Sequence, residues 1–209
     1  MAADLTLGDI LDLRAYERVR EEYRREIIAL KQRRRVALGP IMTLVFECFE
    51  TVRFQVQEMA RVERIATDDG LQAELDVYNR LLPGPGELSA TLFIELTTPE
   101  DLRRWLPALV GVERSIGLEV DGGNGAGPLR VRSEPEAAHA ASLTRDVITP
   151  AVHYLRFPFT AAESEALGGG QATLVADHPA YAARTPLGPA TLEELRDDLA
   201  GRVRRIPLG

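Results

Sequence analysis

Two histidines and an aspartate lie where a metal ion could be bound. His153 alternates with apolar residues in a strand-like run, and Asp177 and His178 close a second strand-like run. Two imidazoles and one carboxylate suit iron or zinc, and ligand sites often form where strands of a sheet end. The sequence therefore offers His153, Asp177 and His178 as a candidate metal site with Fe or Zn as its cofactor. A lone histidine on an apolar strand equally suits a hydrogen-bonded core position.

A group of carboxylates borders a predicted helix over residues 52–67, and paired carboxylates can act as acid and base or hold a metal. The group is Glu47, Glu50, Glu58 and Glu63. Position 61 is an arginine, so Glu58 lacks the histidine three residues on that a di-iron bundle needs. A buried ion-pair network with nearby arginines is the favoured role. Glu58 joins the histidines and Asp177 as a candidate catalytic residue if the protein is an enzyme.

Basic residues are concentrated at the end of the predicted first helix. The cluster is Lys31, Arg33, Arg34 and Arg35. Residues 14–35 contain nine basic and four acidic residues, a local charge of +5. Cations at a helix C-terminus complement its dipole, which favours a solvated last turn. The alternative is an anion clamp for phosphate, an RNA backbone or an acidic protein surface.

Several familiar chemistries lack their residues. Cys48 is the only cysteine, so one chain can form neither a disulfide nor an all-cysteine metal site. We expect it to be buried and inert on an apolar strand. Lys31 is the only lysine and belongs to no phosphate loop, and no GxSxG motif occurs. The Gly122–Gly127 run leads into a strand-like segment, which favours a hairpin loop over a nucleotide loop.

Composition narrows the class further. The chain has 209 residues, 45% hydrophobic and 27% charged, with 25 Lys and Arg against 32 Asp and Glu for a net charge of −7. This is the composition of a globular protein, and its acidity argues against global attraction to nucleic acid or anionic lipid. No apolar run has the length of a membrane span, and the start lacks a signal peptide's basic and apolar regions. We expect a cytoplasmic protein without a membrane partner.

The first 86 residues are predicted to be mainly helical. The first helix is long and amphipathic, covers 9–34 and carries an apolar stripe at Leu13, Tyr16, Val19, Tyr23, Ile27 and Leu30. A second helix covers 52–67, and a third runs from about 71 until Pro83-Gly84-Pro85-Gly86 ends it. A strand over 42–48 interrupts them. The long first helix could also pack in a homo-oligomer.

Four Thr-x-x-acid pairs predict helix starts, because the threonine and the acid can cap each other's backbone N–H groups. They are Thr6/Asp9, Thr98/Asp101, Thr160/Glu163 and Thr191/Glu194. Pro99 directly after Thr98 suits a first helical turn, which makes the helix over 99–109 the best defined of the set.

Residues 87–209 change to an alternation of strands and helices. Apolar residues alternate with others from Leu88 to Leu96, the period of a strand, and further strands are predicted at 116–120, 129–132, 152–159 and 172–177. Helices are predicted at 99–109, 161–167 and 191–204. The order is that of a ferredoxin-like βαββαβ unit. We therefore predict an α+β fold in which an N-terminal helical layer packs on a mixed β-sheet.

Several stretches resemble an uncharacterised bacterial family, domain of unknown function 3501. They are residues 28–40, 51–59 and 78–95, His153-Tyr-Leu-Arg-Phe-Pro158, and Asp177-His-Pro-Ala-Tyr181. The resemblance spans nearly the whole chain, which implies that regions 1–86 and 87–209 form one co-folded unit. Proteins of this kind are encoded near rubrerythrin-like and iron–sulfur redox proteins, so the resemblance implies an accessory role in a redox or peroxide-stress system. The resembling blocks point to Arg33, Arg34, Arg35, Glu58, Asn79, Glu87, His153, Arg156, Asp177 and His178.

The leading hypothesis from the sequence is a cytosolic accessory protein that acts by binding a protein partner. Two alternatives stay open. One is a metal-dependent or acid–base enzyme that uses the His/Asp/Glu candidates, and the other is an anion or nucleic-acid binder that uses Arg33–Arg35.

Overall fold

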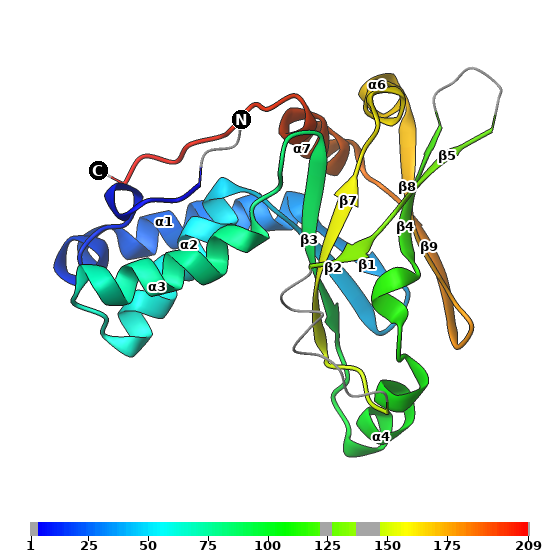
Figure 1. Cartoon of the computed structure of the whole chain (residues 1–209), viewed down its shortest axis with the longest axis horizontal. Coiled ribbons are helices and arrows are strands. Elements are labelled where there is room, and N and C mark those ends of the chain that lie inside the picture. Colours follow the sequence, from blue (N-terminus) through cyan, green and yellow to red (C-terminus); the bar gives the residue numbers. More distant parts are fainter. Residues whose placement is uncertain (1–3, 122–126, 137–146, 209) are drawn as a thin grey trace.

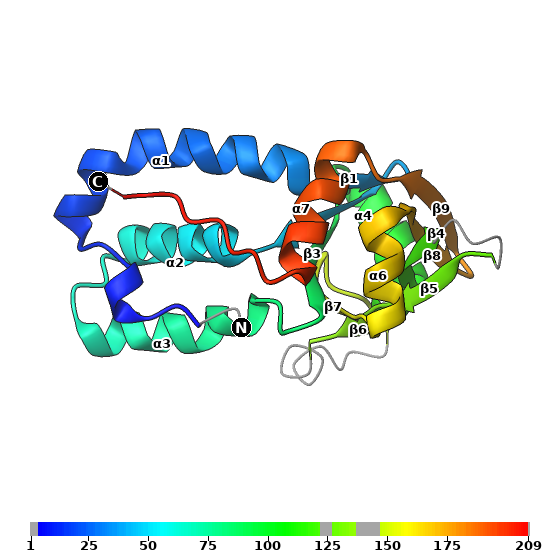
Figure 2. The same cartoon turned by 90° about the horizontal axis from the view of Figure 1, so that it is seen from above.

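The protein consists of a body of two β-sheets and a helical arm that projects from it (Figures 1 and 2). The computed structural model describes residues 4–121, 127–136 and 147–208. The arm is formed by α1 (Leu13–Arg34), α2 (Phe49–Glu63) and α3 (Asp68–Tyr78). The predicted α+β class is confirmed.

Sheet A has five strands in the order β1-β2-β3-β7-β6. Its strands are β1 (Arg35–Leu38), β2 (Met42–Glu47), β3 (Glu87–Ile94), β7 (Val152–Pro158) and β6 (Glu134–Pro135). Sheet B has the order β5-β4-β8-β9, with β5 (Leu129–Arg132), β4 (Ile116–Asp121), β8 (Gln171–His178) and β9 (Tyr181–Pro186). Every strand pairing in both sheets is antiparallel.

The sheet arrangement corrects the prediction of one mixed sheet with a ferredoxin-like unit. The strands and helices follow the predicted order along the chain, but β3 and β7 pair in sheet A while β4, β5 and β8 pair in sheet B. A ferredoxin-like unit would place these strands in a single sheet. Periodicity identifies a strand and its buried face, and it carries no information about which sheet that strand joins.

The body's core lies between the two sheets. In β3 the predicted alternation is confirmed, because Leu88, Ala90, Leu92 and Ile94 belong to this core. Apolar side chains from sheet B, including Leu118 and Leu174, complete it. The opposite face of β3 is also buried but polar: the Thr91 hydroxyl donates to Glu47 at 2.6 Å.

Within the described ranges, three further helices pack against the body: α4 (Pro99–Ala108), α6 (Ala161–Gly169) and α7 (Pro189–Leu199). Thr98 and Thr160 cap α4 and α6 as predicted. Thr6 precedes only a short 3₁₀ turn at Leu7–Asp9, and α1 begins at Leu13 behind its N-cap Asp12, four residues later than predicted. The fourth cap prediction is wrong. Gly188 is the N-cap of α7 and Pro189 begins it, which places Thr191 inside the first turn. Glu194 is consequently free to face α1.

The arm is held by two small apolar clusters rather than by one large core. Tyr16, Tyr23, Ile27 and Leu30 form the buried face of α1, four of the six positions of the predicted stripe. A second cluster joins α2 to α3 and to the 3₁₀ turn Asn79–Leu81 that follows α3. The helix over 52–67 was predicted three residues late at its start and four too long at its end.

Most of the glycine-rich loop and one of the three histidines lie outside the described ranges. Pairing of Val120 with Leu129 joins β4 and β5 as a hairpin, as predicted, but loop residues 122–126 are not described. His139, the third histidine, is not described either. Among the described residues, no helix combines the length and apolarity required to cross a bilayer.

Candidate functional site

The three predicted metal ligands are distributed over the two sheets. His153 lies on β7 of sheet A, whereas Asp177 and His178 end β8 of sheet B. His153 is 1% exposed, and its Nε2 lies 3.0 Å from the Thr149 hydroxyl oxygen. Its Nδ1 lies 4.0 Å from a Glu113 carboxylate oxygen. These contacts are those of a buried structural histidine.

Asp177 and His178 have partners of their own. Asp177 accepts a 2.6 Å hydrogen bond from Arg130. His178 Nε2 lies 3.1 Å from the Val110 carbonyl oxygen, and its Nδ1 accepts the Ala180 N–H at 3.2 Å, so both ring nitrogens are engaged. Within the described residues, no three His, Cys, Asp or Glu side chains gather as a metal site would require.

Glu58 belongs to an ion-pair network between α1 and α2. It accepts hydrogen bonds from the Tyr16 hydroxyl at 2.7 Å and from Arg20 Nε at 2.8 Å, and Arg61 lies 3.5 Å away. Burial alone would raise the pKa of Glu58, but the bonds from Arg20 and Tyr16 outweigh it and lower the pKa to about 2. Glu58 therefore stays ionised and joins two helices, as the network interpretation predicted.

The basic cluster at the end of α1 faces carboxylates. Arg33 Nε lies 2.8 Å from Glu194, and Arg35 lies 2.5 Å from Glu95. Arg34 is 2% exposed, so it is not part of a solvated last turn. Lys31 lies over the ring of Phe54, 5.6 Å from its centre. An anion clamp would have to displace these intramolecular partners.

Arg34 is the centre of a buried ion cluster that joins the arm to the body. Its guanidinium bonds Asp198 through two nitrogens at 2.7 and 2.9 Å and Glu194 through Nε and a terminal nitrogen at 3.1 and 2.9 Å. Burial would raise the pKa of Glu194, but hydrogen bonds and charge from Arg33 and Arg34 lower it. The cluster fixes α7 against the C-terminal end of α1.

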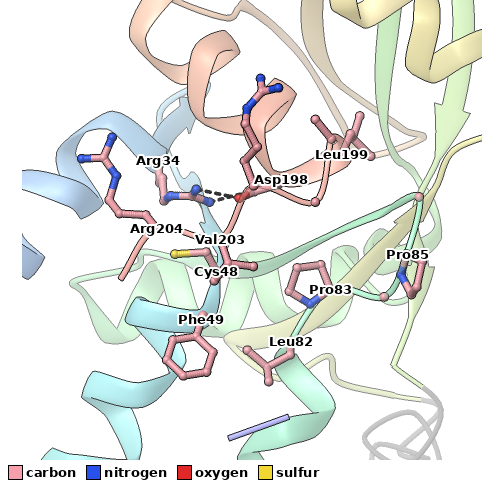
Figure 3. Close-up of a pocket in the computed structure, with 15 residues that line it drawn as sticks. Arg34, Cys48, Phe49, Leu82, Pro83, Pro85, Asp198, Leu199, Val203 and Arg204 are labelled. Carbon is pink, nitrogen blue, oxygen red and sulfur yellow. Dashed lines mark hydrogen bonds and ion pairs between the residues drawn. The ribbon is translucent and has the colours of Figure 1, made fainter. Parts of the chain in front are cut away.

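A small pocket of about 190 Å³ opens beside this cluster. Figure 3 shows Arg34 paired with Asp198 on one side and Cys48, Phe49, Leu82 and Pro83 around the rest. The remaining wall comes from residues 84–86, from residues 199–200 at the end of α7, and from residues 201–204, the start of the C-terminal tail. The junction pocket therefore combines apolar residues with three arginines, Arg34, Arg202 and Arg204, of which Arg34 is paired with Asp198.

Cys48 lines this junction pocket and is 8% exposed. Burial raises the pKa of its thiol, against the opposing influence of Arg34 and of the Thr51 and Glu50 backbone N–H groups. The thiol is therefore protonated at neutral pH. The prediction of a buried cysteine is confirmed, and its inertness remains a prediction.

The C-terminal tail, residues 201–208, lies along the groove between α1 and α2 (Figure 2). Ile206 and Leu208 pack against the cluster that contains Tyr16, Tyr23 and Ile27. The tail has no helical or strand structure, and only Ile206 and Leu208 are half-buried. We call this surface, lined by Val19, Glu22, Tyr23, Glu26, Glu50 and Arg53, the arm groove.

The arm groove binds the backbone of the tail through a buried pair of opposite charges. The Ile206 N–H donates to a Glu50 carboxylate oxygen at 3.1 Å, and its carbonyl accepts from Arg53 at 2.5 Å. Glu50 and Arg53 bond each other at 2.6 Å, and Tyr23 bonds both. One residue of the tail thus has both backbone groups satisfied by the groove.

Sequence reasoning identified Glu50 as a network carboxylate but missed the tail and its contacts. The available signal was the segment Arg204-Arg-Ile-Pro-Leu208 after the last helix, in which two aliphatic residues flank a proline. Proline favours an extended conformation in the residue before it. The predicted helix over 191–204 extends five residues too far, because α7 ends at Leu199. It therefore assigned the start of the tail to a helix and concealed this signal.

Fold and groove together define an α+β protein whose helical arm binds an extended segment of chain. The chain belongs to the family described as protein of unknown function (DUF3501), whose sequence model matches residues 4–199. It is similar to a crystal structure of a novel protein of unknown function from Burkholderia pseudomallei K96243, with 35% identity and a TM-score of 0.82. That match covers 97% of this chain and 100% of the other. None of the curated proteins matches the chain.

Proposed function

We propose that this protein is an accessory protein that works by binding a partner polypeptide in the arm groove. The observation that carries the proposal is the binding of the tail, in which buried Glu50 and Arg53 take both backbone groups of Ile206. Capture of main-chain groups combined with apolar pockets for side chains is a general mode of peptide recognition. A groove that holds its own chain in this way has the chemistry to hold another.

The proposed partner is a rubrerythrin-like or iron–sulfur redox protein, and the proposed compartment is the cytoplasm. This choice of partner follows from the expectation, implied by the family resemblance, that proteins of this kind are encoded near such redox proteins. An accessory role needs no catalytic residues in this chain. The enzyme alternative rests on Glu58, His153, Asp177 and His178, whose side chains have the structural contacts described above.

The test is a calorimetric titration of each purified redox partner into a full-length variant with a weakened tail. This tail-release variant carries Ile206→Asp and Leu208→Asp. The two charged side chains are unfavourable against the apolar cluster, and no residue of the helices is changed. One of the two partners is expected to bind. In this background, Glu22→Lys with Glu26→Lys should weaken binding about tenfold, since both residues line the groove.

Glu17→Lys with Glu21→Lys is the matched control, because it makes the same charge change on exposed positions of α1 that do not line the groove. Binding in this control should stay within about twofold of the tail-release variant. The proposal fails if neither redox protein binds, or if both charge reversals weaken binding equally.

A further inference from the structure

The side chains of the tail show what kind of segment the arm groove selects. Ile206 and Leu208 are two residues apart and both pack against the same apolar cluster. In an extended chain, residues two apart point to the same side. Pro207 between them favours this extended form and has no N–H that would need a partner. The groove therefore accommodates a segment with aliphatic side chains at alternate positions.

Charge adds a second element of selection. The tail contains Arg202, Arg204 and Arg205, while Glu22 and Glu26 line the groove wall on α1. Arg205 lies 3.4 Å from Asp9 and stacks on the ring of Phe49. A basic segment therefore complements the groove walls, and an acidic segment would be repelled.

The tail leaves much of the groove unfilled. A space of about 560 Å³ remains beside residues 204–208, bordered by Val19 and Tyr23 of α1. At the other end of the tail lies the junction pocket of about 190 Å³. A segment with larger aliphatic or aromatic side chains would bury more apolar surface there than the tail does.

Apart from the backbone bonds of Ile206, the tail is weakly anchored. Its arginines are exposed, and the pairs of Arg205 with Asp9 and of Arg202 with Asp197 are surface ion pairs, which contribute little to stability. The family match ends at residue 199, so the groove lies within the matched region and its occupant lies beyond it.

We propose that the arm groove is a binding site for a basic, extended segment of a partner protein with aliphatic residues at alternate positions, and that the tail is its competing internal ligand. The inference rests on the proposed function and adds to it the class of ligand and a means of regulation. A tethered ligand competes at a high effective concentration, so it rejects weak ligands and yields to stronger ones.

A fluorescent peptide with the sequence of residues 201–208 provides the test. It should bind the full-length tail-release variant at least about tenfold more tightly than it binds the wild-type chain, as measured by anisotropy. A control peptide with aspartate in place of the isoleucine and leucine should bind neither protein. Adding Glu22→Lys and Glu26→Lys to the tail-release variant should again reduce affinity, unlike Glu17→Lys with Glu21→Lys.

Equal binding of the peptide to both proteins would overturn the competing-tail inference, and equal binding of the control peptide would overturn the selection of aliphatic residues. Light scattering adds a further outcome. If the wild-type chain dimerises and the tail-release variant does not, the occupant is the tail of a second copy, and the inference of a partner segment is wrong. Peptide binding without redox-partner binding would uphold the groove and reject the proposed function.

Discussion

The body and the arm of this protein are stabilised in different ways. Among the residues that the structure describes, twenty-five buried residues from both sheets and their covering helices form a large apolar core in the body. The arm has two smaller clusters, and its helices α1 and α2 are also joined by polar contacts of Glu58 with Arg20 and of Glu50 with Tyr23. Apolar burial is non-directional, whereas ion pairs have fixed geometry. The arm can therefore hold two helices apart and keep a groove between them.

The largest effect is expected in the body. Phe157 is fully buried and lies 6.0 Å, ring centre to ring centre, from Phe46. Phe157→Ala should lower the free energy of unfolding by about 4 kcal/mol, because it removes apolar contacts and leaves a cavity. Urea denaturation of the full chain measures the change. A loss below about 1 kcal/mol would contradict a body held by its core.

The next effect concerns the junction of arm and body. Arg34→Met should cost about 3 kcal/mol, because it leaves Glu194 and Asp198 with reduced compensation in a buried site. Adding Glu194→Gln and Asp198→Asn should restore more than half of the loss in urea denaturation. If the triple variant were as unstable as the single one, packing of the arginine rather than its charge would hold the junction.

Acid should weaken the arm through Glu58. Its pKa is lowered to about 2 from about 4.5, so its pairing contributes stability above about pH 4.5 that is lost as the pH falls toward 2. Wild type should exceed Glu58→Gln by roughly 2 kcal/mol at pH 7 in unfolding free energy. The gap should narrow steadily between pH 4.5 and pH 3. A gap that stays constant over this range would contradict the ion-pair role.

The smallest effect on stability concerns the tail. The tail-release variant should change the unfolding free energy by less than about 1 kcal/mol, since only two half-buried side chains are affected. Residues 202–204 line the junction pocket with Cys48, so release of the tail should nevertheless speed maleimide labelling of this cysteine several-fold. Unchanged labelling would mean that the tail does not cover the pocket.

Helices and strands could be predicted from the sequence where a single local pattern, such as apolar periodicity or a capping threonine, determines the structure. The stripe of α1 and the alternation of β3 gave correct elements, and Thr98 and Thr160 mark true helix starts. Thr191 failed because Gly188 and Pro189 provide an earlier start. Pairing of strands into two sheets depends on contacts distant in sequence, which periodicity does not encode.

The candidate site was harder to predict from the sequence, because it too depends on contacts between residues that are distant in sequence. From the sequence, Arg34 is expected to be a solvated residue at a helix end. In the structure α7, which is distant in sequence, covers it with Glu194 and Asp198. Glu50 and Arg53 look like an ordinary i,i+3 pair on α2, and their shared role depends on a tail residue more than 150 positions away. His153 and His178 read as potential neighbours, but their strands belong to different sheets.

Hydrogen exchange of the wild-type chain with and without the redox partner tests the central claim most directly, because it observes groove and tail together. The account predicts faster exchange in residues 201–208 when the partner is present, since the tail is displaced, and slower exchange in the facing parts of α1 and α2. Partner binding that leaves the exchange of both the tail and the arm unchanged would contradict the arm groove as the binding site.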